Sequence, residues 1–396
     1  MMLEMHTKSV EKIKDLIREL LECTEMKNGI PRFNYESYSF DKIACELNKR
    51  KTVFKVDNVA CMFIYFDGLS IFFRSGGDYY NKCVTHPISV DEFDSVLDFI
   101  LSLYRSTPMN YKISIPLKHL YFKINDSEER EVNVIEQRME NINHQEKALS
   151  FSSIQISGSG IFYVYGENFF MKDILLKLNI FIFQLLINNV VEIKNSRPVL
   201  LDYWHKYKIH DIPVIKAKIQ NNDYPKIEAE SLIPISLSKY LGDLTLTEKG
   251  DGSNSAEKVT LSMIAAECII KDKTREGERI KSAIDWFMQS QANEDLTMSF
   301  LQMCMGLEAI FGDDDNDGGL TNILADRCSY LIGKNIEERK EIKSNFREVY
   351  RLRSKIVHGV KSNLSPQEMS LRYNAINYLR RSILKEILNM DAFSIK

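Results

Sequence analysis

Apolar and polar residues alternate along the first half of the chain in patterns typical of both helices and strands. Residues 8–21 place an apolar side chain at every third or fourth position, which predicts an amphipathic helix. Residues 59–74 contain two aromatic-rich apolar runs that are joined by Asp67 and Gly68. Because that dipeptide favours a type I′ turn, the pattern predicts a β-hairpin.

Short strands and single helices are predicted between this hairpin and residue 219. Ser89, with Glu92 three positions later, is typical of a capping box that opens a helix. Runs of strands, rather than regular alternation with helices, indicate an α+β arrangement. The predicted elements are a helix from Ser89 to Tyr104, strands at 111–116 and 119–124, a hairpin at 153–165 turning at residues 158–160, a helix near 172–188, and short strands within 190–219.

One apolar segment, residues 174–191, is nearly long enough to span a bilayer. Lys177, Asn179, Gln184 and Asn188 interrupt it. A lysine near the bilayer centre costs roughly 2.5–3.5 kcal/mol. The segment therefore predicts a buried helix of a soluble domain and no contact with a membrane.

The pattern changes after a polar, glycine-rich stretch at residues 248–255, which predicts a linker or a long exposed loop. Beyond it the strand signal disappears and apolar residues recur at helical spacing. We therefore expect an α+β region over residues 1–248 and an all-α domain over residues 256–396. The predicted helices of the second domain lie at 256–270, 276–291, 296–311, 320–332 and 336–358, and from the capping box Ser365–Glu368 to about Met390.

Composition narrows the class of protein. A chain of 396 residues is too long for one ordinary core, and 44% hydrophobic with 27% charged residues excludes a disordered or fibrous chain. A net charge of −3 provides no overall basic field, so any nucleic-acid site must be a local patch. The seven cysteines lack the spacing of a zinc site, and residues 1–10 lack a secretory signal. Reduced thiols and a cytoplasmic location are expected.

Motifs for metals and nucleotides are incomplete. The acidic loop at residues 313–318 places its aspartates as in the first half of an EF-hand, but the twelfth position is Leu324 instead of glutamate. A solvated connection between helices is the favoured interpretation of this loop. The pair His205 and His210 has weak ligand spacing, and neither a phosphate-binding glycine loop nor a nucleophile elbow is present. We expect neither a metal nor another cofactor.

The segment at residues 350–359 combines residue types that RNA cleavage needs. Arg353 carries a permanent charge that can hold a phosphate oxygen, and His358 can transfer a proton near neutral pH. Gly359 offers the left-handed conformation that ends a helix. On these residue types alone, a salt bridge for Arg353 and a helix cap for His358 are the favoured interpretation.

The same helix carries a local excess of positive charge. From Arg339 to Lys361 the chain has eight Lys or Arg and two Glu, so the local charge is 8 − 2 = +6. In a chain of net charge −3, such a stretch is a candidate phosphate-binding face.

Three short motifs change the balance between these interpretations. They are Ile284-Asp-Trp-Phe287, Gly306-Leu-Glu-Ala-Ile-Phe-Gly312 and Arg351-Leu-Arg-Ser-Lys-Ile-Val-His-Gly359. In order and spacing they resemble the HEPN superfamily, all-α domains whose ribonuclease members carry an Arg-x4–6-His motif near the end of a helix. Within it they are similar to the ApeA-like HEPN family of bacterial defence proteins. The resemblance covers residues 275–390, under a third of the chain.

This resemblance implies a metal-independent endoribonuclease that leaves 2′,3′-cyclic phosphate and 5′-hydroxyl ends. It implies a homodimer in which Arg353, holding the phosphate, and His358, transferring a proton, meet across the interface. Ser354 stands at a polar position of the motif. Glu308 stands at an acidic position, where it orients Arg353 or His358 or is a surface carboxylate. Other residues of the segment would line the RNA path, namely Tyr350, Arg351 and Lys355.

The resemblance also implies a role as a toxic ribonuclease in antiviral defence, acting by abortive infection on RNA such as tRNA. The region 1–248 carries no comparable motif. A sensor for a phage-derived trigger, a regulatory cover and a partner-binding module all stay open for it. The alternative to an enzyme is a non-catalytic HEPN module that binds RNA or a protein.

Overall fold

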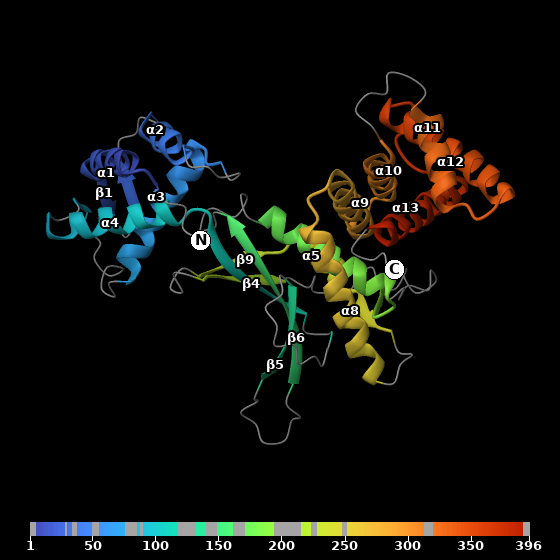
Figure 1. The fold of residues 1–396 in the computed structure, drawn as a ribbon, viewed down its shortest axis with the longest axis horizontal. Coiled ribbons are helices and arrows are strands. Elements are labelled where there is room, and N and C mark those ends of the chain that lie inside the picture. Colours follow the sequence, from blue (N-terminus) through green and yellow to red (C-terminus); the bar gives the residue numbers. More distant parts are fainter. Residues whose placement is uncertain are drawn as a thin grey trace, which may run out of the picture. The chain divides into compact units, whose positions relative to one another are not determined.

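The computed structural model describes most of the chain, and every statement below concerns those residues. They are 5–27, 30–33, 38–49, 55–75, 85–87, 90–117, 120, 132–139, 149–160, 171–193, 215–222, 228–247, 252–312 and 320–390. The chain divides into two compact units (elements labelled in Figure 1). The first contains Met1–Ser114, Ile156–Ile174 and Ala217–Ser231, and the second contains Ile115–Gln155, Leu175–Lys216 and Leu232–Lys396.

Four helices and a small sheet form the amino-terminal part of the first unit. The helix expected at residues 8–21 is confirmed as α1, which buries Ile13, Ile17 and Leu20. Two buried tyrosines form hydrogen bonds within the core. The Tyr65 and Thr24 hydroxyls lie 2.8 Å apart, and the Tyr104 hydroxyl donates to the Cys61 carbonyl at 2.7 Å. The elements are α1 (Thr7–Glu22), α2 (Tyr38–Leu47), α3 (Asn58–Ser75) and α4 (Val90–Ser106), with the sheet order β2 (Ile30–Phe33), β1 (Thr24–Lys27) and β3 (Thr85–Pro87).

The hairpin expected at residues 59–74 is wrong, because these residues form the single helix α3. Nearly every side chain in the run is apolar and much of it is buried, so the sequence offers no periodicity that separates a buried helix from two strands. Gly68 has a packing role here. A Cβ at this position would lie 2.9 Å from the Leu103 side chain of α4, so glycine permits close contact between the two helices.

Five strands pair in one sheet. Its order is β5 (Val132–Met139), β6 (Leu149–Gly160), β4 (Met109–Leu117), β8 (Lys216–Asn221) and β9 (Glu228–Leu232). The strand expected at 111–116 is confirmed as β4, whose side chains alternate between buried and more exposed positions. It pairs antiparallel with β8, Tyr111 opposite Asn221. The turn expected at residues 158–160 is wrong, since they continue β6.

Several further expectations are met in part. The helix expected from Ser89 is confirmed as α4, although Ser89 itself lies outside the described residues. Of the strand expected at 119–124 only Leu120 is described, and it is not in a strand. Residues 161–165 of the second hairpin, and residues 194–214 with His205 and His210, also lie outside the described part of the chain.

The apolar helix expected near 172–188 is α5 (Met171–Ile187). In the second unit Phe183 packs edge-on against Phe287 of α9, with the ring centroids 5.3 Å apart. The amides that interrupt the apolar run also find partners there. The Asn179 amide donates to Asp285 and the Asn188 amide to Ser262, both at 2.8 Å.

Helix α5 packs against the carboxy-terminal helices through α9. Residues 175–216 from the middle of the chain therefore belong to the same compact unit as residues 232–396. Within the described residues, no helix has the length and apolar character needed to cross a membrane.

The carboxy-terminal part of the second unit is all-helical, as expected (yellow-gold to red in Figure 1). Its helices are α8 (Gly252–Lys271), α9 (Arg275–Ala292), α10 (Leu296–Phe311), α11 (Leu320–Ile332), α12 (Ile336–Val357), the short 3-10 helix η3 (Pro366–Glu368) and α13 (Met369–Asn389). The polar side chains of three residues cap the amino-terminal ends of α9, α10 and α12, and these residues are Thr274, Asp295 and Asn335 respectively. Residues 252–255, expected in a linker, form the first turn of α8.

Short elements precede the bundle. Helix α7 (Ile235–Gly242) leads into β10 (Leu244–Leu246), which pairs antiparallel with β7 (Val191–Ile193). Short strands were expected within residues 190–219, and two of them are confirmed as β7 and β8.

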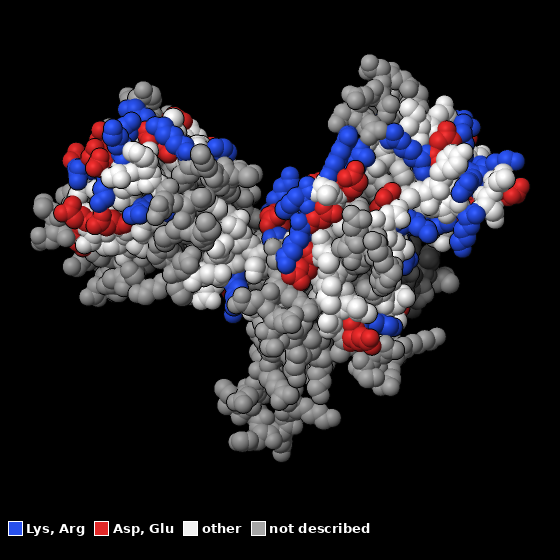
Figure 2. Space-filling model, viewed as in Figure 1, with Lys and Arg blue, Asp and Glu red and all other residues white. Residues whose placement is uncertain are grey.

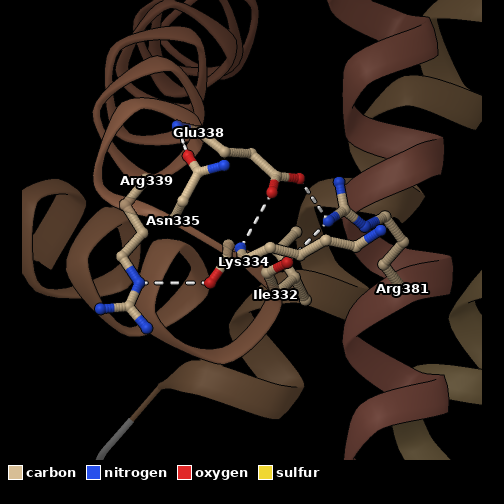
Figure 3. Close-up of polar contacts among 7 residues, drawn as sticks. Ile332, Lys334, Asn335, Glu338, Arg339 and Arg381 are labelled. Carbon is tan, nitrogen blue, oxygen red and sulfur yellow. Dashed lines mark hydrogen bonds and ion pairs between the residues drawn. The ribbon is translucent and has the colours of Figure 1, made fainter.

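The turn between α11 and α12 is bound to α13 by a group of polar contacts (Figure 3). Arg381 of α13 donates to the Ile332 carbonyl at 2.6 Å and to the Glu338 carboxylate at 2.7 Å. Glu338 also accepts from the Lys334 backbone N–H at 2.8 Å, and Arg339 donates through Nε to the Gly333 carbonyl at 3.2 Å. Since charged groups make the stronger hydrogen bonds, this group fixes the turn and both helix ends.

The capping box expected at Ser365 is present at the start of the last helix. The Glu368 carboxylate accepts from the Ser365 backbone N–H and from its hydroxyl, both at 2.8 Å. Lys361 lies 2.6 Å from the same carboxylate. The Lys361 ammonium and the Ser365 groups together lower the pKa of Glu368 to about 2.

Replacing this carboxylate should give a pH-dependent loss of stability. A lowered pKa stabilises the fold above the ordinary carboxyl pKa of about 4.3, and this contribution is lost as the pH falls toward about 2. We expect Glu368→Gln to cost about 1 kcal/mol at pH 7, the usual size for a capping contact that water partly screens. Calorimetric melting at several pH values tests this, with Lys361→Gln showing the same trend. A melting difference that is constant from pH 7 to pH 2.5 would contradict it.

Candidate functional site

Helix α12 carries most of the residues that the sequence singled out. Its amino-terminal end is capped by the Asn335 side chain, which accepts from the Glu338 N–H at 2.8 Å. One stripe of the helix faces the bundle core and consists of Ile342, Phe346, Val349, Tyr350 and Leu352. The helix ends as expected, since His358 is its carboxy-terminal cap and Gly359 has φ +70°. That left-handed conformation is one that glycine adopts without steric cost.

Arg353 and Glu308 are brought together from α12 and α10. An Arg353 terminal nitrogen lies 3.3 Å from one Glu308 carboxylate oxygen and 3.5 Å from the other. The two side chains are 30% and 28% exposed, so the pair lies half-buried at the surface of the bundle. Of the two interpretations of Glu308, this geometry favours a carboxylate that positions Arg353.

The environment of Glu308 disfavours its charge. Burial raises the pKa of the Glu308 carboxyl above its ordinary value, while the Arg353 charge and a hydrogen bond with Tyr350 oppose part of that rise. Arg353 therefore partly offsets the cost of keeping this carboxylate ionised in a half-buried position.

Tyr350 does not line a surface path, so that expectation is wrong. Its side chain is only 5% exposed, and its hydroxyl donates to the Cys304 carbonyl at 3.2 Å. Its ring stacks on Phe346 with the centroids 4.7 Å apart. Tyr350 instead holds α12 against α10, three positions before Arg353.

Cys304 is a neighbour that the sequence analysis missed. It lies one helical turn before Glu308 on α10, and its thiol is buried. Burial raises the pKa of the Cys304 thiol well above its ordinary value, which keeps it neutral. The four-residue spacing of Cys304 and Glu308 was the available signal, since it places both on one face of a helix.

The remaining candidate residues lie outside this pair. Ser354, Lys355 and His358 are exposed, and Arg351 is exposed and paired with Glu348 at 2.6 Å. Side chains five positions apart on a helix point about 140° away from each other. In the described residues, no contact joins His358 to Arg353. One chain therefore presents the two groups on different sides of α12.

The basic stretch from Arg339 to Lys361 is largely matched by local acceptors. Lys343 pairs with Asp326, and Lys361 pairs with Glu368. Figure 2 shows basic and acidic side chains next to one another over the part of the bundle where Figure 1 labels α11 and α12. The charge of this face is therefore smaller than the sequence count of +6 indicates.

The described residues hold no group of three or more His, Cys, Asp or Glu side chains placed to bind a metal ion. The acidic loop at residues 313–318 lies outside the described residues, and Leu324 is buried in α11.

Comparison of the chain with protein-family models, with curated proteins and with solved structures finds no match.

Substitutions of Arg353 and Glu308 should differ in their effect on stability. Arg353→Ala leaves a half-buried carboxylate without its counter-charge, so the pKa of Glu308 should rise further and stability at pH 7 should fall by about 1 kcal/mol. Glu308→Gln removes a charge that burial disfavours, so it should cost less. Titration of the Glu308 carboxyl carbon by NMR, with melting of both variants, tests this. An unchanged Glu308 titration in Arg353→Ala would show that the two groups do not interact.

Proposed function

We propose that this chain is a metal-independent endoribonuclease of the HEPN type, with Arg353 and His358 as its catalytic groups. The observation that carries the proposal is the placement of Arg353. It is a half-buried guanidinium that Glu308 positions, at the end of a helix whose last residues expose His358. The resemblance of the three sequence motifs to HEPN ribonucleases supports the same assignment.

The proposed reaction uses the 2′-hydroxyl of the RNA as the nucleophile. The 2′-oxygen forms a bond to phosphorus while its proton passes to a histidine, and the bond from phosphorus to the 5′-oxygen breaks. The leaving 5′-oxygen takes up a proton from water, which gives 2′,3′-cyclic phosphate and 5′-hydroxyl ends. Arg353 stabilises the charge that develops on the phosphate oxygens, and Ser354 can donate a hydrogen bond beside it.

The geometry of α12 supports a site shared between two chains. Because Arg353 and His358 point about 140° apart on one helix, one phosphate is reached more directly by Arg353 of one chain and His358 of a second. A contact that is repeated by two-fold symmetry would create two such sites. Homodimerisation through the helical bundle is therefore part of the proposal.

The proposed biological role is that of a toxic ribonuclease in abortive infection, with RNA such as tRNA as its substrate. The resemblance to the ApeA-like HEPN family supports this role. The first unit would then serve as a sensor or regulatory part. If the wild-type chain does not cut RNA while the variants below bind it, we would conclude that the chain is a non-catalytic module that binds RNA.

Cleavage should survive removal of metals and depend on both residues. We expect purified protein to cut total RNA in EDTA and His358→Ala to cut about 10²–10⁴-fold more slowly, the usual contribution of a proton-transfer group. Arg353→Lys should also be impaired, because lysine keeps the charge but loses the planar fork. Mapping of the cut ends measures the products. Activity that is lost in EDTA and restored by Mg²⁺ would contradict the proposal.

Mixing two inactive chains should restore part of the activity. If each site takes Arg353 from one chain and His358 from the other, a mixed dimer of Arg353→Ala and His358→Ala contains one intact site. About a quarter to a half of wild-type activity is then expected after unfolding and co-refolding, or after co-expression. Sedimentation of the same samples reports the dimer. Full activity of a monomer would rule out the shared site.

A further inference from the structure

Helices α11 and α12 are joined by three cross-links that repeat every four residues. Asn322 accepts from Arg347 Nε at 3.0 Å, Asp326 pairs with Lys343, and the Arg339 guanidinium carbon lies 5.1 Å from the centre of the Tyr330 ring. The α11 numbers rise as the α12 numbers fall, so the two helices run antiparallel. We call this surface, defined by these six residues, the α11–α12 seam.

The seam has an excess of positive charge. Among the six seam residues, three carry a positive charge, namely Arg339, Lys343 and Arg347, and one carries a negative charge, namely Asp326. Lys343 and Asp326 are 34% and 43% exposed, and water screens such a pair strongly. A phosphate group can therefore compete for these cations at a modest cost.

Tyr330 gives the seam an exposed aromatic surface. Its side chain is 68% exposed, although tyrosine usually buries much of its ring. The guanidinium above it does not move freely, because Arg339 Nε is bound to the Gly333 carbonyl at 3.2 Å (Figure 3). The turn that supplies this carbonyl is itself fixed to α13 by Arg381. The ring and the cation are thus positioned before any ligand arrives.

We propose that the α11–α12 seam binds single-stranded RNA, with a base stacked on Tyr330 and the backbone phosphates on Lys343 and Arg347. An exposed aromatic ring next to a row of cations is the arrangement that binds unpaired nucleotides without a strict sequence preference. A duplex keeps its bases stacked on each other and offers no free face to the ring. The proposal rests on the proposed function, since it names the surface that would bring RNA to His358.

The basic row continues from the seam toward the candidate site. Arg351 and Lys355 extend the four-residue spacing of Arg339, Lys343 and Arg347 along α12, and both are exposed. At 100° per residue, His358 lies on the same side of α12 as Arg351, two turns later, and the nineteen residues from Arg339 to His358 span about 28 Å. A strand held at the seam would thus run along α12 to His358.

The test measures binding separately from cleavage. The full-length His358→Ala chain is titrated into a fluorescent 12-nucleotide oligouridine, and anisotropy gives the Kd. Adding Tyr330→Ala should weaken binding by roughly 5- to 150-fold, the range for loss of one stacked base. Tyr330→Phe keeps the ring and should bind within about 2-fold of its parent. Tyr373→Ala is the matched control, because Tyr373 on α13 is also 68% exposed.

The salt dependence tests the phosphate contacts. For single strands the slope of log K against log salt is about −0.7 for each phosphate neutralised. Arg347→Gln should therefore make the slope shallower by about 0.7, whereas Arg380→Gln, an exposed control on α13, should leave it unchanged. Melting curves of all variants confirm that they are folded.

The possible failures can be told apart. If wild type cuts RNA and Tyr330→Ala binds as tightly as its parent, the seam assignment is wrong and the proposed function stands. If Tyr330→Ala and Tyr373→Ala weaken binding equally, the seam assignment is also wrong. If the wild-type chain neither binds nor cuts RNA, the proposed function and the seam assignment both fail.

Discussion

The packing of α12 against α10 and α13 is the interaction on which the candidate site depends. Phe346 stacks on Tyr350, and its ring also lies 6.4 Å from that of Tyr378 on α13. Gly306 permits the close approach of α13, since a Cβ there would lie 2.7 Å from the Leu379 side chain. These contacts set the rotation of α12 about its axis. Only in that rotation does the Tyr350 hydroxyl reach the Cys304 carbonyl while Arg353 faces Glu308.

The helical bundle was largely predictable from the sequence because its signals are local. Its helices are long and amphipathic, and capping residues such as Thr274, Asp295 and Asn335 mark where they start. The amino-terminal half was predicted less well. Residues 59–74 are apolar on every side, so their periodicity cannot distinguish a helix from a hairpin. The contact between α5 and α9 was not predicted, because contacts between distant segments leave no local pattern.

The candidate site shows the same limit. The family resemblance offered the pairing of Glu308 with Arg353 as one of several roles for Glu308, whereas periodicity alone gave only two residues on separate helices. Tyr350 was assigned to the surface because one helix does not reveal which of its faces a neighbour will cover. The four-residue spacing of the seam residues can be seen in the sequence of each helix. A single sequence does not show, however, that α11 and α12 face each other so that Arg339 meets Tyr330.

The contact between α5 and α9 has a consequence for synthesis of the chain. Asn179 and Asp285, which join the two helices, are 106 positions apart. At the usual rate of 5–20 residues per second, α5 emerges from the ribosome roughly 5–20 s before its partner exists. During that interval one of the most apolar segments of the protein is exposed to other nascent chains. Chaperone binding to this helix, and aggregation of chains truncated before α9, follow from the order in which the two helices are made.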